Sequence, residues 1–326
     1  MTRSGEFHWI SKYLAPLAGT GSFGLRDDAA LIDVPAGKSV VVTQDAIASG
    51  IHFLPDTSLD LVARKAMRVN ISDIVGKAAL PHSYSLALGV PDDWQDADIA
   101  SFASGLAEDQ ALYGIQLTGG DIYRSPDRLC IAVTMFALID PARYKSRLGA
   151  RAGDAIMVTG TIGDAALGLK VATGEIKADP TATDHLLNAY HLPDPPVATA
   201  IAGAIAQYAS ASMDISDGLI GDCRKLCAAS NVGAILNRSK IPLSDAAAQR
   251  VSEDDGLWKS IYTGGDDYQV LCTMPASAKA DFQNACASEN VRATHVGDIK
   301  GAEFGSMALD IDGTPVSIEE DSFSHF

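Results

Sequence analysis

Aspartate is the residue type in this chain with the most potential for chemistry, because it recurs where apolar runs end and beside glycines. Asp45 closely follows the apolar residues 40–42, and Asp214 and Asp217 flank Ile215 and Ser216 ahead of a glycine. Hard divalent cations prefer oxygen ligands, and an adjacent glycine lets a large anion approach the backbone. Further aspartates in such positions are Asp28, Asp73, Asp121 and Asp266. The pattern indicates a site where cations and phosphate groups bind together.

Turn formation and helix capping are the ordinary explanation for any single one of these motifs, since aspartate and glycine serve both purposes widely. Several of the aspartates follow β-branched runs where no cap is needed, so the set as a whole favours binding. Carboxylates repel phosphate unless cations intervene. An acidic protein that handles a nucleotide is therefore expected to do so through Mg²⁺.

Other chemical motifs are weak. The run from Gly19 to Gly24 matches G-x-G-x-x-G by letter, but it follows a predicted helix and precedes a predicted strand, the reverse of a dinucleotide-binding turn. The chain contains no G-x-x-x-x-G-K-[ST] sequence and no His-Arg-Asp or Asp-Phe-Gly sequence. These motifs give no support to a P-loop or protein-kinase site.

Composition narrows the class of protein further. The 326 residues include 25 Lys and Arg against 41 Asp and Glu, a formal charge of −16. Such a charge argues against non-specific binding to nucleic acid or to anionic membrane. No signal-peptide or membrane-spanning segment is evident, and five scattered cysteines suggest reduced thiols, so a cytoplasmic location is expected.

The elements that must position the aspartates alternate between strands and helices in both halves. Apolar spacing predicts helices over residues 59–74, 96–113 and 219–229, and strands over 29–34, 39–43, 84–90, 129–138, 155–159 and 212–215. Residues 179–196, rich in Pro, Asp and His, are expected to form a surface excursion. The basic segment 141–153 marks a domain junction, giving domains 1–140 and 141–326 of α/β or α+β class.

The ordered set of motifs resembles the thiamine-monophosphate kinases along nearly the whole chain. The matching segments are Asp27-Asp28-Ala-Ala-Leu31, Thr43-Gln-Asp45, Gly50-Ile-His52-Phe53, Asn70-Ile-Ser-Asp73, Gly119-Gly-Asp121, Asp214-Ile-Ser-Asp217-Gly-Leu, Gly264-Gly-Asp-Asp-Tyr268 and His325-Phe326. The resemblance implies a two-domain fold like that of aminoimidazole ribonucleotide synthetase. It also implies a homodimer in which N-terminal sheets from two chains close a β-barrel, and it assigns ATP and Mg²⁺ binding to domain 1–140.

The resemblance further implies roles for individual residues in ATP-dependent phosphorylation of thiamine monophosphate. Mg²⁺ ligands would be Asp28, Thr43, Asp45, Asp73, Asp121, Asp214 and Asp217. ATP contacts would be Thr43, Gly120, Asp121, Arg147 and Ser216, and thiamine monophosphate contacts would be His52, Asp266 and Phe323. The residues closest to catalysis would be Asp45, Asp121, Asp214 and Arg147.

Some positions depart from the family pattern. Arg26 stands where glycine is usual, Gln44 where threonine is usual, and Asp266 and Gln269 where glutamate is usual. Asp266 keeps the charge with a shorter reach. Alternatives to the kinase are another ATP-using synthetase of the same superfamily and a non-catalytic module that binds divalent cations or nucleotides.

Overall fold

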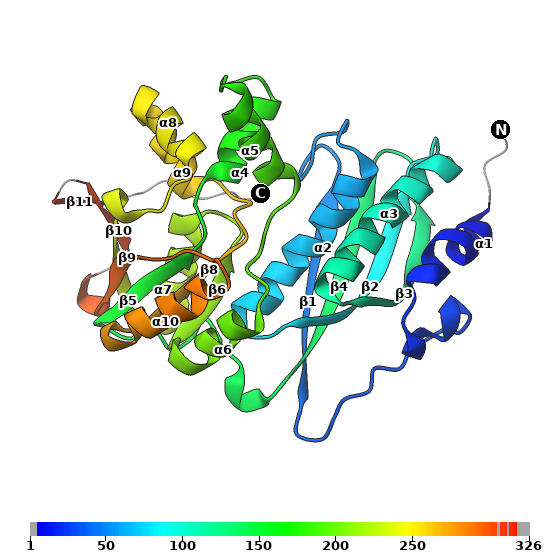
Figure 1. Ribbon diagram of the computed structural model, residues 1–326, viewed down its shortest axis with the longest axis horizontal. Coiled ribbons are helices and arrows are strands. Elements are labelled where there is room, and N and C mark those ends of the chain that lie inside the picture. Colours follow the sequence, from blue (N-terminus) through cyan, green and yellow to red (C-terminus); the bar gives the residue numbers. More distant parts are fainter. Residues whose placement is uncertain (1–4, 305–306, 312, 318–326) are drawn as a thin grey trace. The chain divides into compact units, whose positions relative to one another are not determined.

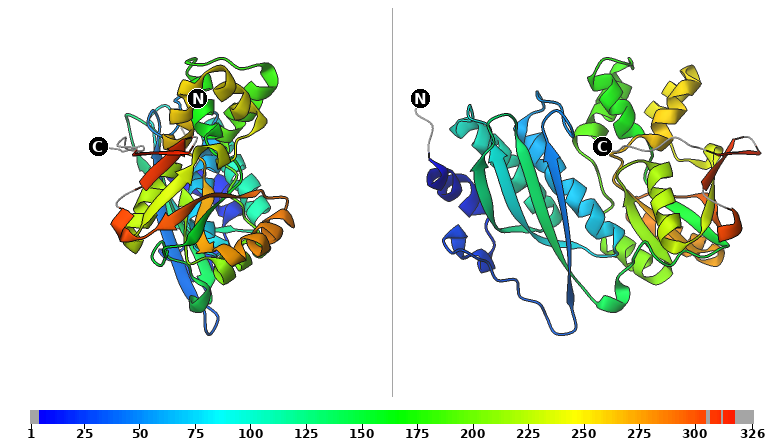
Figure 2. Two further views of the ribbon diagram at one scale, coloured as in Figure 1. Left: turned by 90° about the vertical axis from the view of Figure 1, so that its left-hand side faces the viewer. Right: turned by 180° about the vertical axis from the view of Figure 1, so that it is seen from behind.

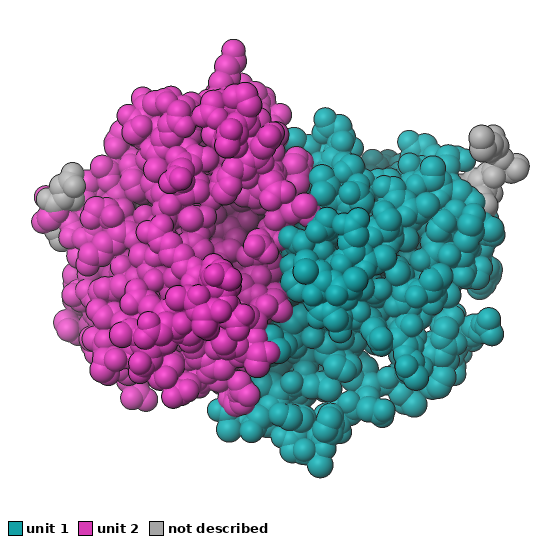
Figure 3. Space-filling view, viewed as in Figure 1, with its two compact units in different colours: residues 1–74, 79–142 teal, residues 75–78, 143–326 magenta. Residues whose placement is uncertain are grey.

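Residues 5–304, 307–311 and 313–317 are described by a computed structural model in which the chain divides into two α/β units. Unit 1 comprises residues 1–74 and 79–142, and unit 2 comprises residues 75–78 and 143–326 (Figure 3). The mixture of strands and helices within each unit confirms the predicted fold class. No helix in the described ranges has both the length and the apolar character needed to span a membrane.

Unit 1 is built on a four-stranded sheet with the order β1-β4-β2-β3. Its strands are β1 (Ser39–Ala48), β2 (Pro81–Val90), β3 (Gln116–Arg124) and β4 (Cys130–Ile139). β4 runs antiparallel to both β1 and β2, whereas β3 runs parallel to β2. The helices α2 (Leu59–Gly76) and α3 (Asp96–Tyr113) cover one face of this sheet (Figures 1 and 2).

The two faces of this sheet differ in burial. Along β4, Ile131, Val133 and Met135 are buried beneath the helices, and the residues between them are only half-buried. The register places Val40 and Val42 of β1 on that second face, where they are 43% and 59% exposed. Within the described chain, the second face of the sheet therefore carries exposed apolar side chains.

The N-terminal segment is mostly helical, with α1 (Glu6–Trp9) followed by helical turns at Ile10–Leu14, Ala15–Leu17 and Thr20–Leu25. The strand predicted over residues 29–34 is wrong, because none of these residues is in a strand. The Leu31 amide donates instead to the Gly21 carbonyl at 2.8 Å. Leu31 and Val34 are 67% and 43% exposed, so this apolar run is not buried as a core strand would be.

Unit 2 contains a seven-stranded sheet with the order β11-β10-β7-β9-β5-β8-β6. Its strands are β5 (Asp154–Thr159), β6 (Ala211–Ile215), β7 (Gly233–Asn237), β8 (Gln269–Pro275), β9 (Ala293–Lys300), β10 (Met307–Ile311) and β11 (Thr314–Ser317). The β10–β7 pair is parallel and the other pairs are antiparallel. Every residue of β5 and β6 is buried, as expected of strands covered on both faces.

Seven helices accompany this sheet in the described part of unit 2. They are α4 (Asp164–Ala172), α5 (Pro180–His191), α6 (Thr199–Tyr208), α7 (Leu219–Ser230), α8 (Asp245–Glu253), α9 (Trp258–Thr263) and α10 (Lys279–Ala287). The surface excursion predicted over residues 179–196 is wrong for most of that range. Asp179 accepts a hydrogen bond from the Ala182 amide at 3.0 Å, and Pro180 occupies the first turn of α5, where proline is favourable.

Candidate active site

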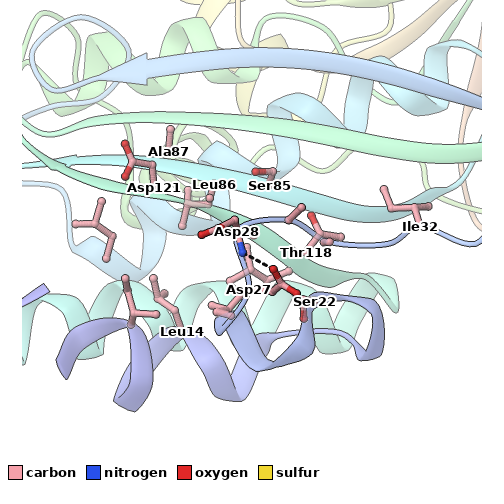
Figure 4. Close-up of a pocket in the computed structure, with 18 of the residues that line it drawn as sticks. Leu14, Ser22, Asp27, Asp28, Ile32, Ser85, Leu86, Ala87, Thr118 and Asp121 are labelled. Carbon is pink, nitrogen blue, oxygen red and sulfur yellow. Dashed lines mark hydrogen bonds between the residues drawn. The ribbon is translucent and has the colours of Figure 1, made fainter. Parts of the chain in front are cut away.

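A cavity of about 560 Å³ in unit 1 brings together three of the predicted site residues, Asp28, Gly120 and Asp121 (Figure 4). Asp28 comes from the loop after the helical turn Thr20–Leu25, and Gly120 and Asp121 come from β3. The Asp28 amide donates to Oδ1 of Asp27 at 2.7 Å, which is the dashed line in Figure 4. Carboxylates from two separate segments thus share one cavity with a glycine pair.

The glycine pair in β3 exposes its backbone at this cavity. A Cβ atom on Gly120 would lie 1.8 Å from the Leu86 carbonyl oxygen of β2, so no larger residue fits there without movement. A Cβ on Gly119 would meet no atom within 4 Å, since that residue faces open space. Exposed backbone beside carboxylates suits a phosphate group accompanied by a cation. This is the combination of ligands that the sequence predicts.

A second group of predicted residues lies where β1 meets α2. Thr43 Oγ1 donates a hydrogen bond to Oδ2 of Asp73. Asn70, one helical turn before Asp73, accepts the Asp45 amide on Oδ1 at 2.8 Å and donates to the Ala66 carbonyl at 3.0 Å. Asn70 therefore fixes the backbone of β1 at Asp45, a role that the sequence analysis did not assign to it.

The strand register separates these two groups. Thr43 and Asp45 pair with Met135 and Val133, which face the helices, whereas Asp121 is in register with Ala87 on the other face. In the described ranges there is no group of three or more His, Cys, Asp or Glu side chains that could hold a metal ion. The complete set of predicted Mg²⁺ ligands stays a prediction.

His52 takes part in a tight turn after β1. Its Nδ1 accepts the Ala48 amide at 3.1 Å, and its own amide donates to the Ala48 carbonyl at 3.0 Å. Gly50, at φ 75°, donates its amide to the Phe53 carbonyl at 2.8 Å and completes the turn. The turn fixes the orientation of the imidazole ring, and contact of that ring with thiamine monophosphate stays a prediction.

In unit 2, Asp214, Ser216 and Asp217 stand where β6 ends and α7 begins. Asp214 is buried in the strand, and Asp217 accepts a hydrogen bond from the Lys225 ammonium group. Gly218, at φ 105°, closes the turn, and a Cβ atom there would lie 2.7 Å from the Thr263 carbonyl. This close packing holds the Ser216–Asp217 turn against the loop that follows α9.

The loop after α9 carries Asp266, predicted to contact thiamine monophosphate. Its amide donates to the Ser216 carbonyl at 2.9 Å, and its Oδ1 accepts the Tyr268 hydroxyl at 3.0 Å. Asp266 has φ 72°, a conformation that costs a non-glycine residue free energy and that recurs at functional sites. Asp266 also lines a cavity of about 400 Å³ within unit 2, together with Asp164, His185 and Asp267.

Asp267 lies beside Asp266 and was not assigned a role from the sequence. Its Oδ1 accepts the Gly163 amide at 2.7 Å, just before α4, whereas its Oδ2 is buried with no hydrogen-bond partner. Burial raises the pKa of this carboxyl well above its ordinary value. The only sequence signal for Asp267 is its place in the Gly264-Gly-Asp-Asp motif.

The remaining two predicted contacts are Arg147 and Phe323. Arg147 is exposed in the segment before β5, and its backbone carbonyl accepts the Ser230 hydroxyl at 2.9 Å. Phe323 lies outside the described residues. Both assignments stay predictions.

Protein-family models and known proteins match this chain over most of its length. The model described as AIR synthase related protein, N-terminal domain, matches residues 26–139, and the corresponding C-terminal domain model matches residues 151–309. The thiamine-monophosphate kinase of Caulobacter vibrioides is 36% identical over 317 residues, which are 95% of this chain and 88% of that protein. The Escherichia coli K12 thiamine-monophosphate kinase is 32% identical over 99% of this chain and 98% of its own length.

Solved structures show the same relationship. The crystal structure of thiamine-monophosphate kinase from Stenotrophomonas maltophilia K279a matches with a TM-score of 0.80 and 29% identity, covering 90% of this chain and 91% of that one. A structure described as AaThiL complexed with AMPPCP and TMP matches with a TM-score of 0.78 and 27% identity, covering 100% and 99% of the two chains. The predicted family and the two-domain AIR synthase-like fold are thereby confirmed. The chain belongs to the thiamine-monophosphate kinase family.

Proposed function

We propose that the protein transfers the γ-phosphoryl group of ATP to thiamine monophosphate and releases ADP and thiamine diphosphate. The observation that carries this proposal is the match over the whole chain to the structure described as complexed with AMPPCP and TMP. Kinases that are 32% and 36% identical over nearly the full chain support the same reaction. ATP is thus the co-substrate and thiamine monophosphate the acceptor.

Direct in-line transfer is the mechanism that these residues fit best. A phosphate monoester has a second pKa near ~6, so the acceptor is largely dianionic at neutral pH and needs no general base. The principal difficulty is to bring two polyanions together. Mg²⁺, when bound, supplies the charge neutralisation that phosphoryl transfer requires.

The donor set of this chain fits that cation chemistry. Asp28 and Asp121 place carboxylates in the unit 1 cavity beside the open backbone of Gly119. We assign Mg²⁺ binding to Asp28, Thr43, Asp45, Asp73, Asp121, Asp214 and Asp217. The Gly120 backbone, Ser216 and Arg147 would hold the ATP phosphates, and Arg147 would also stabilise charge on the transferred group.

The thiamine end of the acceptor would lie near His52 and Asp266, with Phe323 against its rings. A carboxylate at Asp266 suits the positive charge of a thiazolium ring. The turn at residues 48–53 and the hydrogen bond from Tyr268 keep His52 and Asp266 in defined orientations.

Assembly as a homodimer is the second part of the proposal. The apolar side chains Val40, Val42, Leu31 and Val34 are all at least 43% exposed in unit 1. Val40 and Val42 share one face of the sheet, where exposed apolar side chains favour association, and closing a barrel removes exposed sheet edges. We therefore assign residues 1–140 to dimerisation as well as to ATP and Mg²⁺ binding, and residues 141–326 to a second α/β domain.

The location that we propose is the cytoplasm. The five free cysteines agree with this reducing compartment.

The experiment that tests the reaction is an ATP-consumption assay on the full chain with Mg²⁺ and one acceptor at a time. Thiamine monophosphate should drive ADP release, and the acyclic precursor of aminoimidazole ribonucleotide should not. ADP release that depends on the aminoimidazole precursor would instead identify a synthetase of the same superfamily. No ATP turnover with either acceptor would favour a non-catalytic binding module.

A further inference from the structure

Asp222, in the first turn of α7, holds the Ser216–Asp217 turn through its side chain. Its Oδ2 accepts the backbone amides of both Ser216 and Asp217, each at 2.9 Å. The carboxyl group is fully buried, with 0% of the residue exposed. Two successive amides bound to one carboxylate oxygen fix the direction of the backbone at the residues proposed to contact ATP and Mg²⁺.

The other side of the same turn is held as well. The Ser216 carbonyl accepts the Asp266 amide at 2.9 Å, and a Cβ on Gly265 would lie 2.4 Å from that carbonyl oxygen. The turn is therefore fixed between Asp222 on its amide side and the Gly264–Asp267 loop on its carbonyl side.

Lys225 connects this buried carboxylate to the proposed cation ligand. Its ammonium group donates to Oδ1 of Asp222 at 2.8 Å and to Oδ2 of Asp217. The Lys225 side chain is 41% exposed and that of Asp217 is 33% exposed, whereas that of Asp222 is not exposed. A compact charge on a flexible four-carbon stem can release Asp217 while it stays bound to Asp222.

We propose that Asp222 is a positioning residue for nucleotide binding and that Lys225 is the counter-cation of Asp217, displaced when a divalent cation binds there. This inference rests on the proposed function, which assigns Ser216 to ATP and Asp217 to Mg²⁺. Asp222 acts through the backbone of the turn and contacts neither substrate. Lys225 and a divalent cation compete for the same carboxylate, so the lysine raises the cation concentration needed to occupy the site.

The test measures binding separately from turnover. Calorimetry gives the Kd of AMPPCP at saturating Mg²⁺ and then its dependence on Mg²⁺ concentration, for the wild type, Asp222→Asn and Lys225→Met. Asp281→Asn, in the first turn of α10, and Lys170→Met, from the surface ion pair with Glu175, are matched controls. Thermal unfolding midpoints are recorded for every variant.

Asp222→Asn keeps the side-chain shape but loses the charge that binds Lys225 and the two amides. Its Kd for AMPPCP and its KM for ATP should rise about tenfold, the size of one lost hydrogen bond to a charged group, with a smaller change in kcat. Lys225→Met should lower the Mg²⁺ concentration for half-maximal AMPPCP binding by roughly threefold, as expected for loss of a partly exposed ion pair. Both controls should bind as the wild type does.

Unchanged AMPPCP affinity in Asp222→Asn together with a lower unfolding midpoint would show a merely structural carboxylate and overturn the positioning role. An unchanged or higher Mg²⁺ requirement in Lys225→Met would overturn the competition, and this variant tests the competition even if Asp222→Asn does not fold. Wild-type protein that binds AMPPCP but does not phosphorylate thiamine monophosphate would contradict the proposed function alone.

Discussion

The carboxyl group of Asp267 is buried, and one of its oxygens has no hydrogen-bond partner. Burial raises its pKa well above the ordinary value, so the native state keeps the proton at pH values where the unfolded state has lost it. The contribution of this carboxyl group to the free energy of unfolding is therefore fully present below the ordinary carboxyl pKa. It is lost as pH rises through the raised native pKa. Asp267→Asn removes that titration.

We expect Asp267→Asn to unfold at higher urea concentration than the wild type at pH 8 and to show a smaller difference at pH 5. Urea unfolding at the two pH values provides the comparison. A variant that is less stable than the wild type at pH 8 would mean that the carboxylate is accommodated in its charged form.

Asp45 and Asp214 test the assignment of carboxylates to cation binding. Asp45→Asn and Asp214→Asn should each lower kcat roughly 100-fold or more, as expected when a group that stabilises transition-state charge is lost. Circular dichroism should show a wild-type fold in both variants. Near-normal turnover in both variants would contradict the assignment of these carboxylates to cation binding.

The sequence predicts which aspartates are candidates for cation binding. It does not show which neighbouring side chains form hydrogen bonds or ion pairs with them and with their backbone. Asp222 was missed, because an acidic residue in the first turn of a helix is ordinarily explained by the helix dipole. The hydrogen bonds that it accepts from the Ser216 and Asp217 amides depend on how the turn before α7 folds. Asn70 was present in a matching motif, but its bond to Asp45 depends on the packing of α2 against β1.

The close approach of β3 to β2 at Gly120 predicts that a larger residue there destabilises the fold. Gly120→Ala places a Cβ 1.8 Å from the Leu86 carbonyl, so it should lower the unfolding free energy by about 2 kcal/mol or more. Gly119→Ala, whose Cβ would meet nothing within 4 Å, is the matched control and should unfold as the wild type does. Equal unfolding midpoints in the two variants would contradict the described strand pairing.

Helices with strong apolar periodicity were predicted correctly. The helix that begins at a proline and the apolar segment that pairs with no described strand were not. The helix predicted over residues 96–113 is α3 to the residue, and that over 59–74 is extended by two residues in α2. α5 was missed because Pro180 and the polar residues around it suggested a loop, although they form the start of a helix. Residues 29–34 have strand-like composition but no strand, since no described strand pairs with them.

The exposed apolar face of the unit 1 sheet predicts that the protein dimerises. Sedimentation at micromolar concentration should give a mass near twice 34.1 kDa. Val42→Lys on that face should shift the protein toward the monomer, and Leu112→Lys, a substitution of an exposed leucine on α3, should not. A wild-type protein that sediments only near 34.1 kDa would count against the homodimer.

Acceptor choice tests the proposed reaction directly, because the proposed mechanism depends on the acceptor's phosphate. That phosphate would bind beside the cations that the aspartates are proposed to hold, and it supplies a nucleophile that is already ionised. Free thiamine offers a hydroxyl of high pKa, which needs a general base. The proposed site assigns that role to no residue.

The measurement is product formation from thiamine monophosphate and from thiamine, at equal concentration, with saturating ATP and Mg²⁺. We expect thiamine diphosphate from the first acceptor and no phosphorylated product from the second. Comparable phosphorylation of both acceptors would contradict this expectation, because the site would then not depend on the acceptor's phosphate.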